Sequence, residues 1–203
     1  MIKKTIKVFC ITAGMLVILF FFRAQLLQSI GNFLILSSQP EKSDVIWVID
    51  YNLECIETLH ENGMGKKIAI IGGSGLLDLK ALGVDYSLSD TFKMQLVKKG
   101  IHGEAIYVNK TDSGLSQEIQ EVLFYCKKNN FKSVLVPIEK HLSRNFYNAV
   151  KNIFEENGIV VTLYNTEPIA FKMDGWWKNE YGLLSIYGEY SKIFYHLLNL
   201  DEQ

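Results

Sequence analysis

The pattern of apolar and polar residues divides the chain into an uncharged N-terminal run and a longer alternation of short apolar stretches. Residues 8–22 carry no charged side chain, three lysines precede the run, and Arg23 closes it. A transmembrane helix needs about 20 mostly apolar residues, and the side-chain stem of Arg23 can lengthen the apolar zone by reaching the headgroups. We therefore expect residues 1–30 to form one N-terminal membrane anchor.

Two other interpretations of this run stay open, namely a cleaved signal peptide and a buried core helix. A signal peptide needs only about 7–15 apolar residues followed by small residues at its cleavage site. The sequence Phe22-Arg23-Ala24 offers one small residue, which favours an uncleaved anchor. Because most nearby positive charge precedes the run, the N-terminus is expected in the cytoplasm and the rest of the chain outside a single-pass cell-membrane anchor.

Beyond a polar boundary at residues 39–42, β-favouring runs alternate with helical patterns. The expected strands are 45–49, 67–71, 104–108, 133–137 and 159–164. The expected helices are 53–61, one that Ser89 or Asp90 caps and Gly100 ends, 116–127, 145–156, and a last one after Gly175-Trp176-Trp177. This alternation is typical of βαβ crossovers. We expect residues 31–203 to form an α/β, Rossmann-like three-layer sandwich with a mainly parallel five-stranded sheet, preceded by the transmembrane helix.

The last helical pattern has two interpretations. Its apolar residues recur at three-to-four spacing, which is typical of a helix packed on the sheet. Alternatively, Trp176 and Trp177 rest at a membrane interface, where indole side chains are enriched.

Composition narrows the function classes. Lys and Arg number 21 and Asp and Glu number 22, so the net charge of −1 indicates no nucleic-acid partner. Cys55 and Cys126 are expected as two buried thiols, with a single disulfide as the alternative, and no cysteine–histidine spacing indicates a metal site. The chain also lacks the glycine spacing of dinucleotide and nucleotide-triphosphate sites. We expect no cofactor and no metal.

Polar and glycine residues follow the predicted strands, where ligands bind in an open parallel sheet. Asp50 follows the first strand and His141 the fourth, and we interpret them as a candidate base and acid. The candidate ligand-binding residues are Gly72, Gly73, Ser74, Gly75, Thr111 and Arg144. Exposed backbone N–H groups of the glycine turn and the guanidinium of Arg144 suit a phosphate. The alternatives are a plain tight turn at the glycines and a surface or capping pair at His141 and Arg144.

The order of several motifs is similar to that of a known family. The motifs are Pro40-Glu41-Lys42-Ser43-Asp44-Val45-Ile46, Gly65-Lys66-Lys67-Ile68 leading to Gly72-Gly73, Leu82-Gly83-Val84, Lys140-His141-Leu142-Ser143-Arg144, Trp176-Trp177 and Glu189-Tyr190-Ser191-Lys192. From about residue 31 to residue 200 the chain resembles the YdcF-like (DUF218) domain, the family of the SanA and ElyC envelope proteins. The family has a Gly-Gly pair ending its first strand and an arginine soon after, whereas this chain has Asp50-Tyr51 and no arginine until Arg144.

The resemblance implies a bacterial membrane-anchored protein with a role in cell-envelope biogenesis, in either the cell wall or surface polysaccharide. The altered pocket implies that the chain binds a phosphate-bearing envelope precursor, or an envelope protein partner, without intact catalysis. The alternative is a hydrolase or transferase acting on a phosphate or phosphosugar group, in which Asp50 is the base, His141 the acid and Arg144 an anion clamp. A third interpretation is a tethered scaffold with a filled crevice.

Overall fold

The computed structural model describes residues 21–37, 39–72, 87–110 and 114–198, and these residues form two compact units. One unit comprises residues 36–166 and holds the sheet. The other combines the residues up to 35 with those from 167 onward. Residues 1–20, which include most of the expected anchor, lie outside the described part. None of the helices in the described ranges is both long and apolar enough to cross a bilayer.

The sheet has five strands in the order β3-β2-β1-β4-β5, and every pair is parallel. The strands are β1 (Ser43–Val48), β2 (Gly65–Ile71), β3 (Ile106–Asn109), β4 (Ser133–Glu139) and β5 (Val160–Thr166). The expected α/β class with a parallel five-stranded sheet is therefore confirmed. β3 begins later than expected because Gly103–Ala105 form a 3-10 turn, η1.

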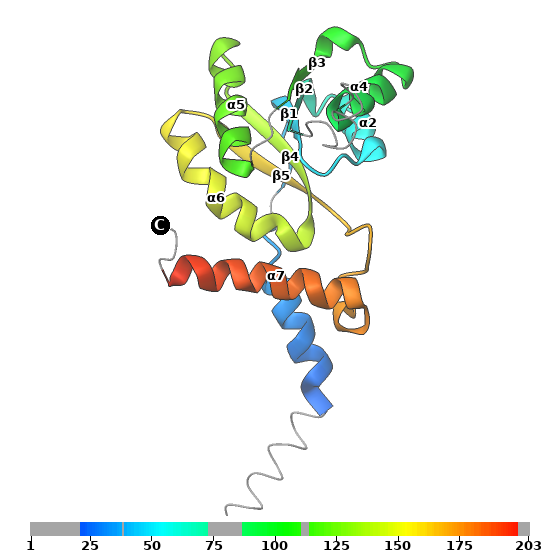
Figure 1. Cartoon of the computed structure of the whole chain (residues 1–203), viewed down its shortest axis with the longest axis vertical. Coiled ribbons are helices and arrows are strands. Elements are labelled where there is room, and N and C mark those ends of the chain that lie inside the picture. The colour runs from blue at the N-terminus through cyan, green and yellow to red at the C-terminus, as the bar shows by residue number, and fades with distance from the viewer. Residues whose placement is uncertain (1–20, 38, 73–86, 111–113, 199–203) are drawn as a thin grey trace, which may run out of the picture. The chain divides into compact units, whose positions relative to one another are not determined.

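Helices cover both faces of this sheet, which gives three layers (Figure 1). They are α2 (Leu53–Glu61), α4 (Leu88–Lys98), α5 (Leu115–Lys128) and α6 (Ser143–Glu156). Alternate residues of β1 point to opposite faces: Trp47 packs with residues of α5 and α6, whereas Ile46 packs with residues of α2 and α4. Because both faces are buried, the strands read as continuous apolar runs.

Local hydrogen bonds set where the helices start. Asn52 caps α2 by accepting from the backbone N–H of Cys55. Ser87 caps α4 by accepting from the N–H of Asp90, so the expected caps at Ser89 and Asp90 are wrong by two or three residues. The hydroxyl of Ser89 is committed elsewhere, because it donates to the carbonyl of Gly72.

The second unit is built from a helix over residues 21–33, the 3-10 turn η3 (Trp176–Lys178) and α7 (Glu180–Leu197). Its core is small, and its buried members are Leu34, Phe171, Met173, Trp176 and Ile186. The Trp176 indole N–H donates to the carbonyl of Leu27 at 3.0 Å. Trp176 is only 5% exposed, so the interpretation that places it at a membrane interface is wrong for this residue.

Candidate functional site

The strand order creates a switch point between β1 and β4. The chain leaves β1 toward β2 on one side, and it later returns to place β4 on the other side of β1. Crevices at such switch points, outside the carboxyl ends of the strands, are the usual ligand sites of open α/β sheets. Asp50 lies just beyond the end of β1, Glu139 is the last residue of β4, and His141 follows in η2 (Lys140–Leu142).

The strand register aligns these residues across the sheet. Val45 pairs with Val134, and continuing that register along both strands brings Asp50 level with Glu139. In the same way, the pairing of Val48 with Ile70 continues to Asp50 and Gly72. Gly72, Asp50 and Glu139 therefore form one row along the carboxyl edge of the sheet.

Asp50 sits in an environment that disfavours its charge. Burial raises the pKa of the Asp50 carboxyl, and the negative charge of Glu139 raises it further, while a hydrogen bond from the N–H of Asn52 at 3.4 Å acts in the opposite direction. The Asp50 Oδ2 atom is buried and has no hydrogen-bond partner within the described part of the chain. A half-buried carboxyl with a raised pKa is a typical proton-transfer group or polar anchor in a binding site.

Glu139 connects Asp50 to His141. The Nδ1 atom of His141 lies 3.7 Å from Oε2 of Glu139, and the imidazole side chain is only 4% exposed. The two residues proposed as base and acid are therefore neighbours of the same carboxylate. Arg144 lies in the first turn of α6 and is half-buried. Glu139 is not among the sequence-predicted site residues, although its position at the end of an apolar strand was a usable signal.

Gly72 brings a second group of side chains to the same edge. Its φ is +91°, and a Cβ there would lie 2.5 Å from Oε1 of Glu118, which reaches over from α5. Burial raises the pKa of Glu118. The Tyr51 hydroxyl lies 3.3 Å from the Ser89 hydroxyl, which itself donates to the carbonyl of Gly72. Glu118, Tyr51 and Ser89 were all absent from the sequence-predicted site.

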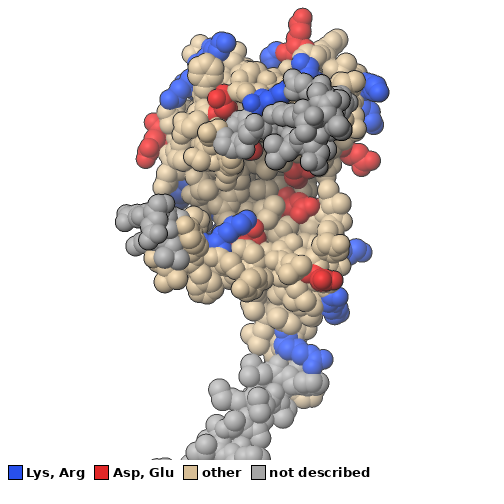
Figure 2. Space-filling model, viewed as in Figure 1, with Lys and Arg blue, Asp and Glu red and all other residues tan. Residues whose placement is uncertain are grey.

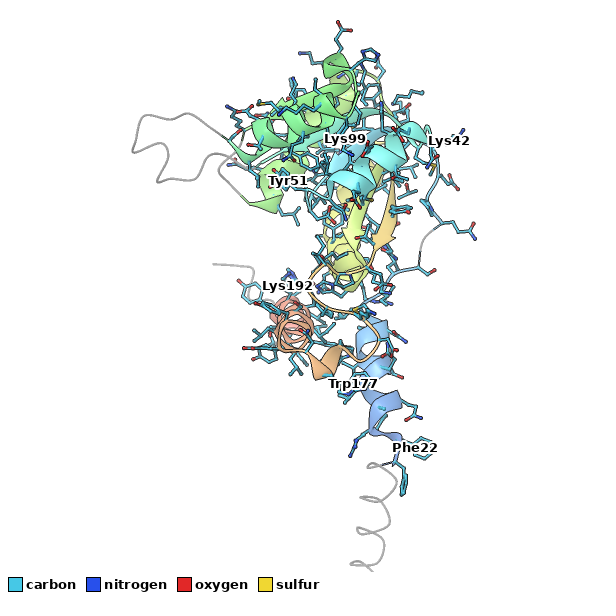
Figure 3. All side chains as sticks on the ribbon, turned by 90° about the vertical axis from the view of Figure 1, so that its right-hand side faces the viewer. Phe22, Lys42, Tyr51, Lys99, Trp177 and Lys192 are labelled. Atoms are coloured by element: carbon cyan, nitrogen blue, oxygen red, sulfur yellow. The ribbon has the colours of Figure 1, made fainter. Side chains whose placement is uncertain are left out.

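Tyr51 has a backbone conformation that is unusual for its side chain. Its φ is +53°, in the left-handed region that glycine adopts at little cost and other residues rarely adopt. The ring packs edge-on against Phe92, with centroids 5.3 Å apart. Tyr51 follows the end of β1, and in Figure 3 it lies beside helices of this unit. The turn after β1 is therefore held in a glycine-like shape by a large side chain that is packed in place.

The described part of the edge is rich in carboxylates. It contains Asp50, Glu118 and Glu139, whose oxygens accept hydrogen bonds from hydroxyl groups. Four of the proposed ligand-binding residues, Gly73, Ser74, Gly75 and Thr111, lie outside the described residues. No group of three or more His, Cys, Asp or Glu side chains within the described ranges is arranged to hold a metal ion.

Charges of both signs are interspersed on the face drawn in Figure 2, and the described residues there form no broad patch of one sign. Cys55 and Cys126 carry free thiols and belong to opposite faces of the sheet. Burial raises the pKa of Cys55 to about 11 and that of Cys126 to about 12. Both thiols are therefore protonated and poorly nucleophilic at neutral pH.

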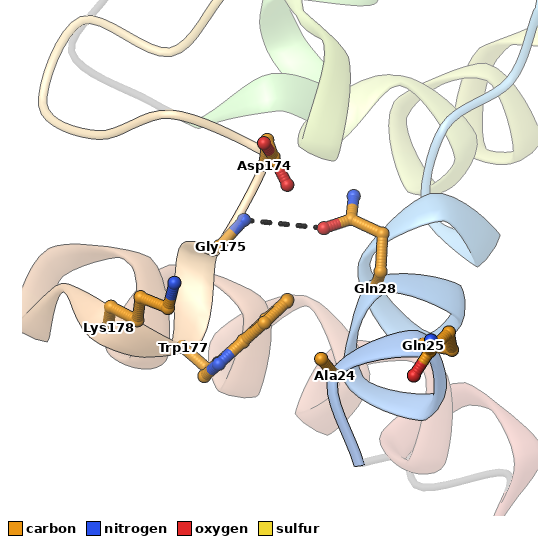
Figure 4. A pocket seen from close by; sticks show the side chains of 7 residues that line it. All are labelled: Ala24, Gln25, Gln28, Asp174, Gly175, Trp177 and Lys178. Carbon is orange, nitrogen blue, oxygen red and sulfur yellow. Dashed lines mark hydrogen bonds between the residues drawn. The ribbon is translucent and has the colours of Figure 1, made fainter. Parts of the chain in front are cut away.

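A separate cavity of about 360 Å³ lies in the unit that contains α7 (Figure 4). It is lined by Ala24, Gln25 and Gln28 of the N-terminal helix and by Asp174, Gly175, Trp177 and Lys178. Gln28 spans it, because its Oε1 accepts from the N–H of Gly175 at 3.3 Å and its Nε2 donates to the carbonyl of Met173 at 3.2 Å. No predicted site residue lies here.

Comparison of the whole chain with known proteins found no matching family, no matching curated protein and no matching solved structure.

Proposed function

We propose that this chain is a membrane-anchored, extracytoplasmic YdcF-like protein that binds a phosphosugar-bearing envelope precursor at the β1/β4 edge of its sheet. The observation that carries the proposal is the pairing of Asp50 with Glu139 at the switch point, where the pKa of Asp50 is raised by burial and by the charge of Glu139. Half-buried carboxylates at the carboxyl edge of a parallel sheet are a feature of ligand sites and have no evident role in packing.

Tyr51 stands where this chain departs from the pattern that it otherwise resembles. The YdcF-like pattern has a Gly-Gly pair where this chain has Asp50-Tyr51. Tyr51 has a φ of +53°, which is the kind of conformation that makes a glycine useful at such a turn. The turn after β1 thus keeps a backbone conformation that a glycine could adopt, although the residue is tyrosine.

The chemistry of the edge indicates which part of a ligand it contacts. The carboxylates of Asp50 and Glu139 suit the hydroxyl groups of a sugar, which are hydrogen-bond donors. Carboxylates repel a phosphate, so we assign the phosphate to Gly73, Ser74, Gly75, Thr111 and Arg144. Because the His141 side chain is 4% exposed, it is poorly placed to reach a ligand from solvent, which favours binding over catalysis.

A second candidate is a hydrolase or transferase for a phosphate or phosphosugar group. The observation that favours it is the raised pKa of Asp50, because a carboxyl titrating closer to neutral pH is a better general acid or base. In this case Asp50 acts on the substrate and His141 acts through Glu139.

The membrane location rests on sequence. Residues 8–22 are uncharged and follow three lysines, so the first helix crosses the cell membrane with its N-terminus in the cytoplasm. The sheet then lies outside, where lipid-linked sugars and envelope proteins are accessible partners. This location gives the protein a role in the biogenesis of the cell wall or of surface polysaccharide.

Calorimetry on the full chain in detergent micelles tests the function. We expect saturable binding of a sugar 1-phosphate, such as N-acetylglucosamine 1-phosphate, that weakens at least tenfold in Asp50→Asn. The control Asp174→Asn, in the other unit, leaves the affinity unchanged. Absence of binding in the wild type contradicts the proposal. Release of phosphate that is lost in both Asp50→Asn and His141→Ala would instead support the second candidate.

A further inference from the structure

Exposed apolar side chains are concentrated in the unit that contains α7. On α7 itself, Leu183, Tyr187 and Phe194 are 48%, 74% and 61% exposed, and we call these three residues the apolar flank. The helix packs into its own unit through a different stripe, which contains Gly182 and Ile186. The apolar flank is therefore left uncovered by the described residues of its own unit.

The opposite flank of α7 carries polar side chains together with the exposed Tyr181, Leu184 and Tyr195. Successive helical residues are rotated by about 100°, so all three residues of the apolar flank lie at least about 130° around the helix from Lys192. Lys192 forms an ion pair with Glu189, at 2.5 Å from Nζ to Oε1. Ser185 and His196 share this side of the helix by the same spacing. Exposed apolar side chains therefore lie on both flanks of α7, and the charged and hydrogen-bonding groups gather around Lys192.

Two hydrogen bonds fix α7 and η3 against the helix formed by residues 21–33. Trp176 donates to the carbonyl of Leu27 at 3.0 Å, and the Tyr190 hydroxyl donates to the carbonyl of Ile30 at 2.9 Å. In Figures 1 and 3, α7 runs crosswise to that helix. If the helix of residues 21–33 runs along the membrane normal, a helix that crosses it at a steep angle lies parallel to the membrane plane.

The height of this crossing follows from helix geometry. A helix rises 1.5 Å per residue, so Leu27 and Ile30 stand about 6 Å and about 10 Å above Arg23 along the helix axis. The headgroup region extends roughly 5–8 Å beyond each side of the hydrocarbon core. If the apolar run ends at Arg23, as its sequence indicates, the Leu27 contact of η3 lies within the headgroup region and the Ile30 contact of α7 lies just above it, so side chains of α7 that face the anchor end reach the headgroups.

The apolar flank of α7 is oriented toward the end of the unit from which the expected membrane anchor extends. Figure 3 shows Lys192 on the side of α7 away from Phe22, so the apolar flank faces the anchor end. Trp177 lies on the Phe22 side, with the Lys178 ammonium 6.0 Å from the centre of its ring. Tryptophan and lysine are residues that occupy the membrane interface.

We propose that α7 is an interfacial helix that lies on the outer surface of the bilayer, with Leu183, Tyr187 and Phe194 immersed in it. The proposal rests on the anchoring part of the proposed function and commits to lipid as the occupant of the apolar flank. A second copy of the chain would cover an apolar flank equally well, but it would not require this flank to face the anchor. The consequence is that the unit containing α7 rests on the outer surface of the membrane.

Site-directed spin labelling of the full chain in anionic phospholipid nanodiscs tests the proposal. The test variant is Tyr187→Cys and the matched control is Lys192→Cys, both in a Cys10→Ala background. Cys55 and Cys126 label poorly because their pKa values are about 11 and about 12. Both substituted positions are exposed. Because Lys192→Cys removes the ion-pair partner of the buried Glu189, circular dichroism of both variants checks that they fold before labelling.

The readout is the collision rate of each label with oxygen, which partitions into lipid, and with a water-soluble nickel chelate. We expect the ratio of oxygen to nickel accessibility to be several-fold higher at position 187 than at position 192. Equal ratios overturn the proposal, and so does spin–spin broadening at position 187, which would indicate a second copy of the chain. Carbonate extraction tests the anchor separately: a chain that is released contradicts anchoring, whereas a retained chain with a water-exposed label contradicts this inference alone.

Discussion

Asp50 follows the end of β1 and Glu139 ends the neighbouring strand β4, and the pKa of Asp50 is raised first by burial and further by the charge of Glu139. This position is unfavourable for folding at neutral pH, since burial and the nearby charge both disfavour the ionised form of Asp50. The location of Asp50 and Glu139 at the switch point of the sheet gives this cost a functional interpretation. The first prediction follows from this pair.

Replacing Asp50 by Asn is expected to stabilise the protein at neutral pH. Because the folded-state pKa of Asp50 is raised, folding favours its protonated form, and stability falls as pH rises from the unfolded pKa through the folded one. Asparagine keeps the acceptor for the N–H of Asn52 and carries no charge. The gain should therefore be present at pH 7 and should disappear near pH 3, as measured by urea denaturation at both pH values.

Asp44 provides a comparison, because its pKa is shifted in the opposite direction from that of Asp50. Its pKa is lowered, first by a hydrogen bond from the N–H of Lys132 at 2.8 Å and then by Lys66. A lowered folded-state pKa contributes stability above the unfolded pKa, and this is lost as pH falls through the folded one. Asp44→Asn should cost about 1 kcal/mol at pH 7 and little below the folded pKa. If both Asp variants shift stability in the same direction at pH 7, the electrostatic account is contradicted.

The turn after β1 is tested by two substitutions of Tyr51. Both Gly and Ala remove the contact with Phe92, but only Gly adopts a positive φ without strain. We expect Tyr51→Gly to be more stable than Tyr51→Ala by about 1 kcal/mol, in a comparison of thermal or urea unfolding. An alanine variant of equal or greater stability would show that the left-handed conformation is not maintained.

The backbone conformation of Gly72, which follows the end of β2, is tested by a substitution to alanine. Gly72→Ala is expected to lower the free energy of unfolding by about 1–3 kcal/mol, because φ is +91° and the new methyl group meets Glu118. Adding Glu118→Ala should recover only part of this loss, since it removes the clash and leaves the backbone strain. Full recovery in the double variant would mean that the conformation of Gly72 is not constrained.

Two glycines of α7, Gly182 and Gly188, offer a test variant and its control. A methyl group at Gly182 would overlap the carbonyl oxygen of Trp176, whereas one at Gly188 meets nothing within 4 Å. Gly182→Ala should therefore destabilise by about 1–3 kcal/mol. Gly188→Ala should stabilise by about 0.5–1 kcal/mol, because alanine is the better helix former. Circular dichroism during thermal unfolding distinguishes the two, and similar effects would argue against the packing of η3 on α7.

The fold was predictable because its signals are local. Each strand is a continuous apolar run ended by a polar residue, and α2 was predicted with the bounds that the structure gives it. The cap at Ser87 was missed because Ser89 and Asp90 are equally good cap residues, and only the burial of Ser89 against Gly72 separates them.

The positions of the candidate residues were predictable only where they directly follow a strand. Asp50, Gly72 and His141 were predicted at strand ends, and the structure has them beyond the carboxyl ends of β1, β2 and β4. Glu118 was missed because it reaches that edge from α5, and such tertiary approach leaves no sequence pattern. The burial of Trp176 could not be predicted either, since a pair of tryptophans is typical both of a protein core and of a membrane interface.

The position of the ligand on the sheet is the most direct test of the account. In the full chain in micelles, with ¹³C-labelled side-chain carboxyls, a sugar 1-phosphate should shift the Asp50 and Glu139 signals with one common saturation curve. The signal of Asp44, at the amino end of β1, should stay unchanged. Shifts at Asp44 without shifts at Asp50 and Glu139, or no shift at any of the three, would contradict a ligand site at the β1/β4 edge.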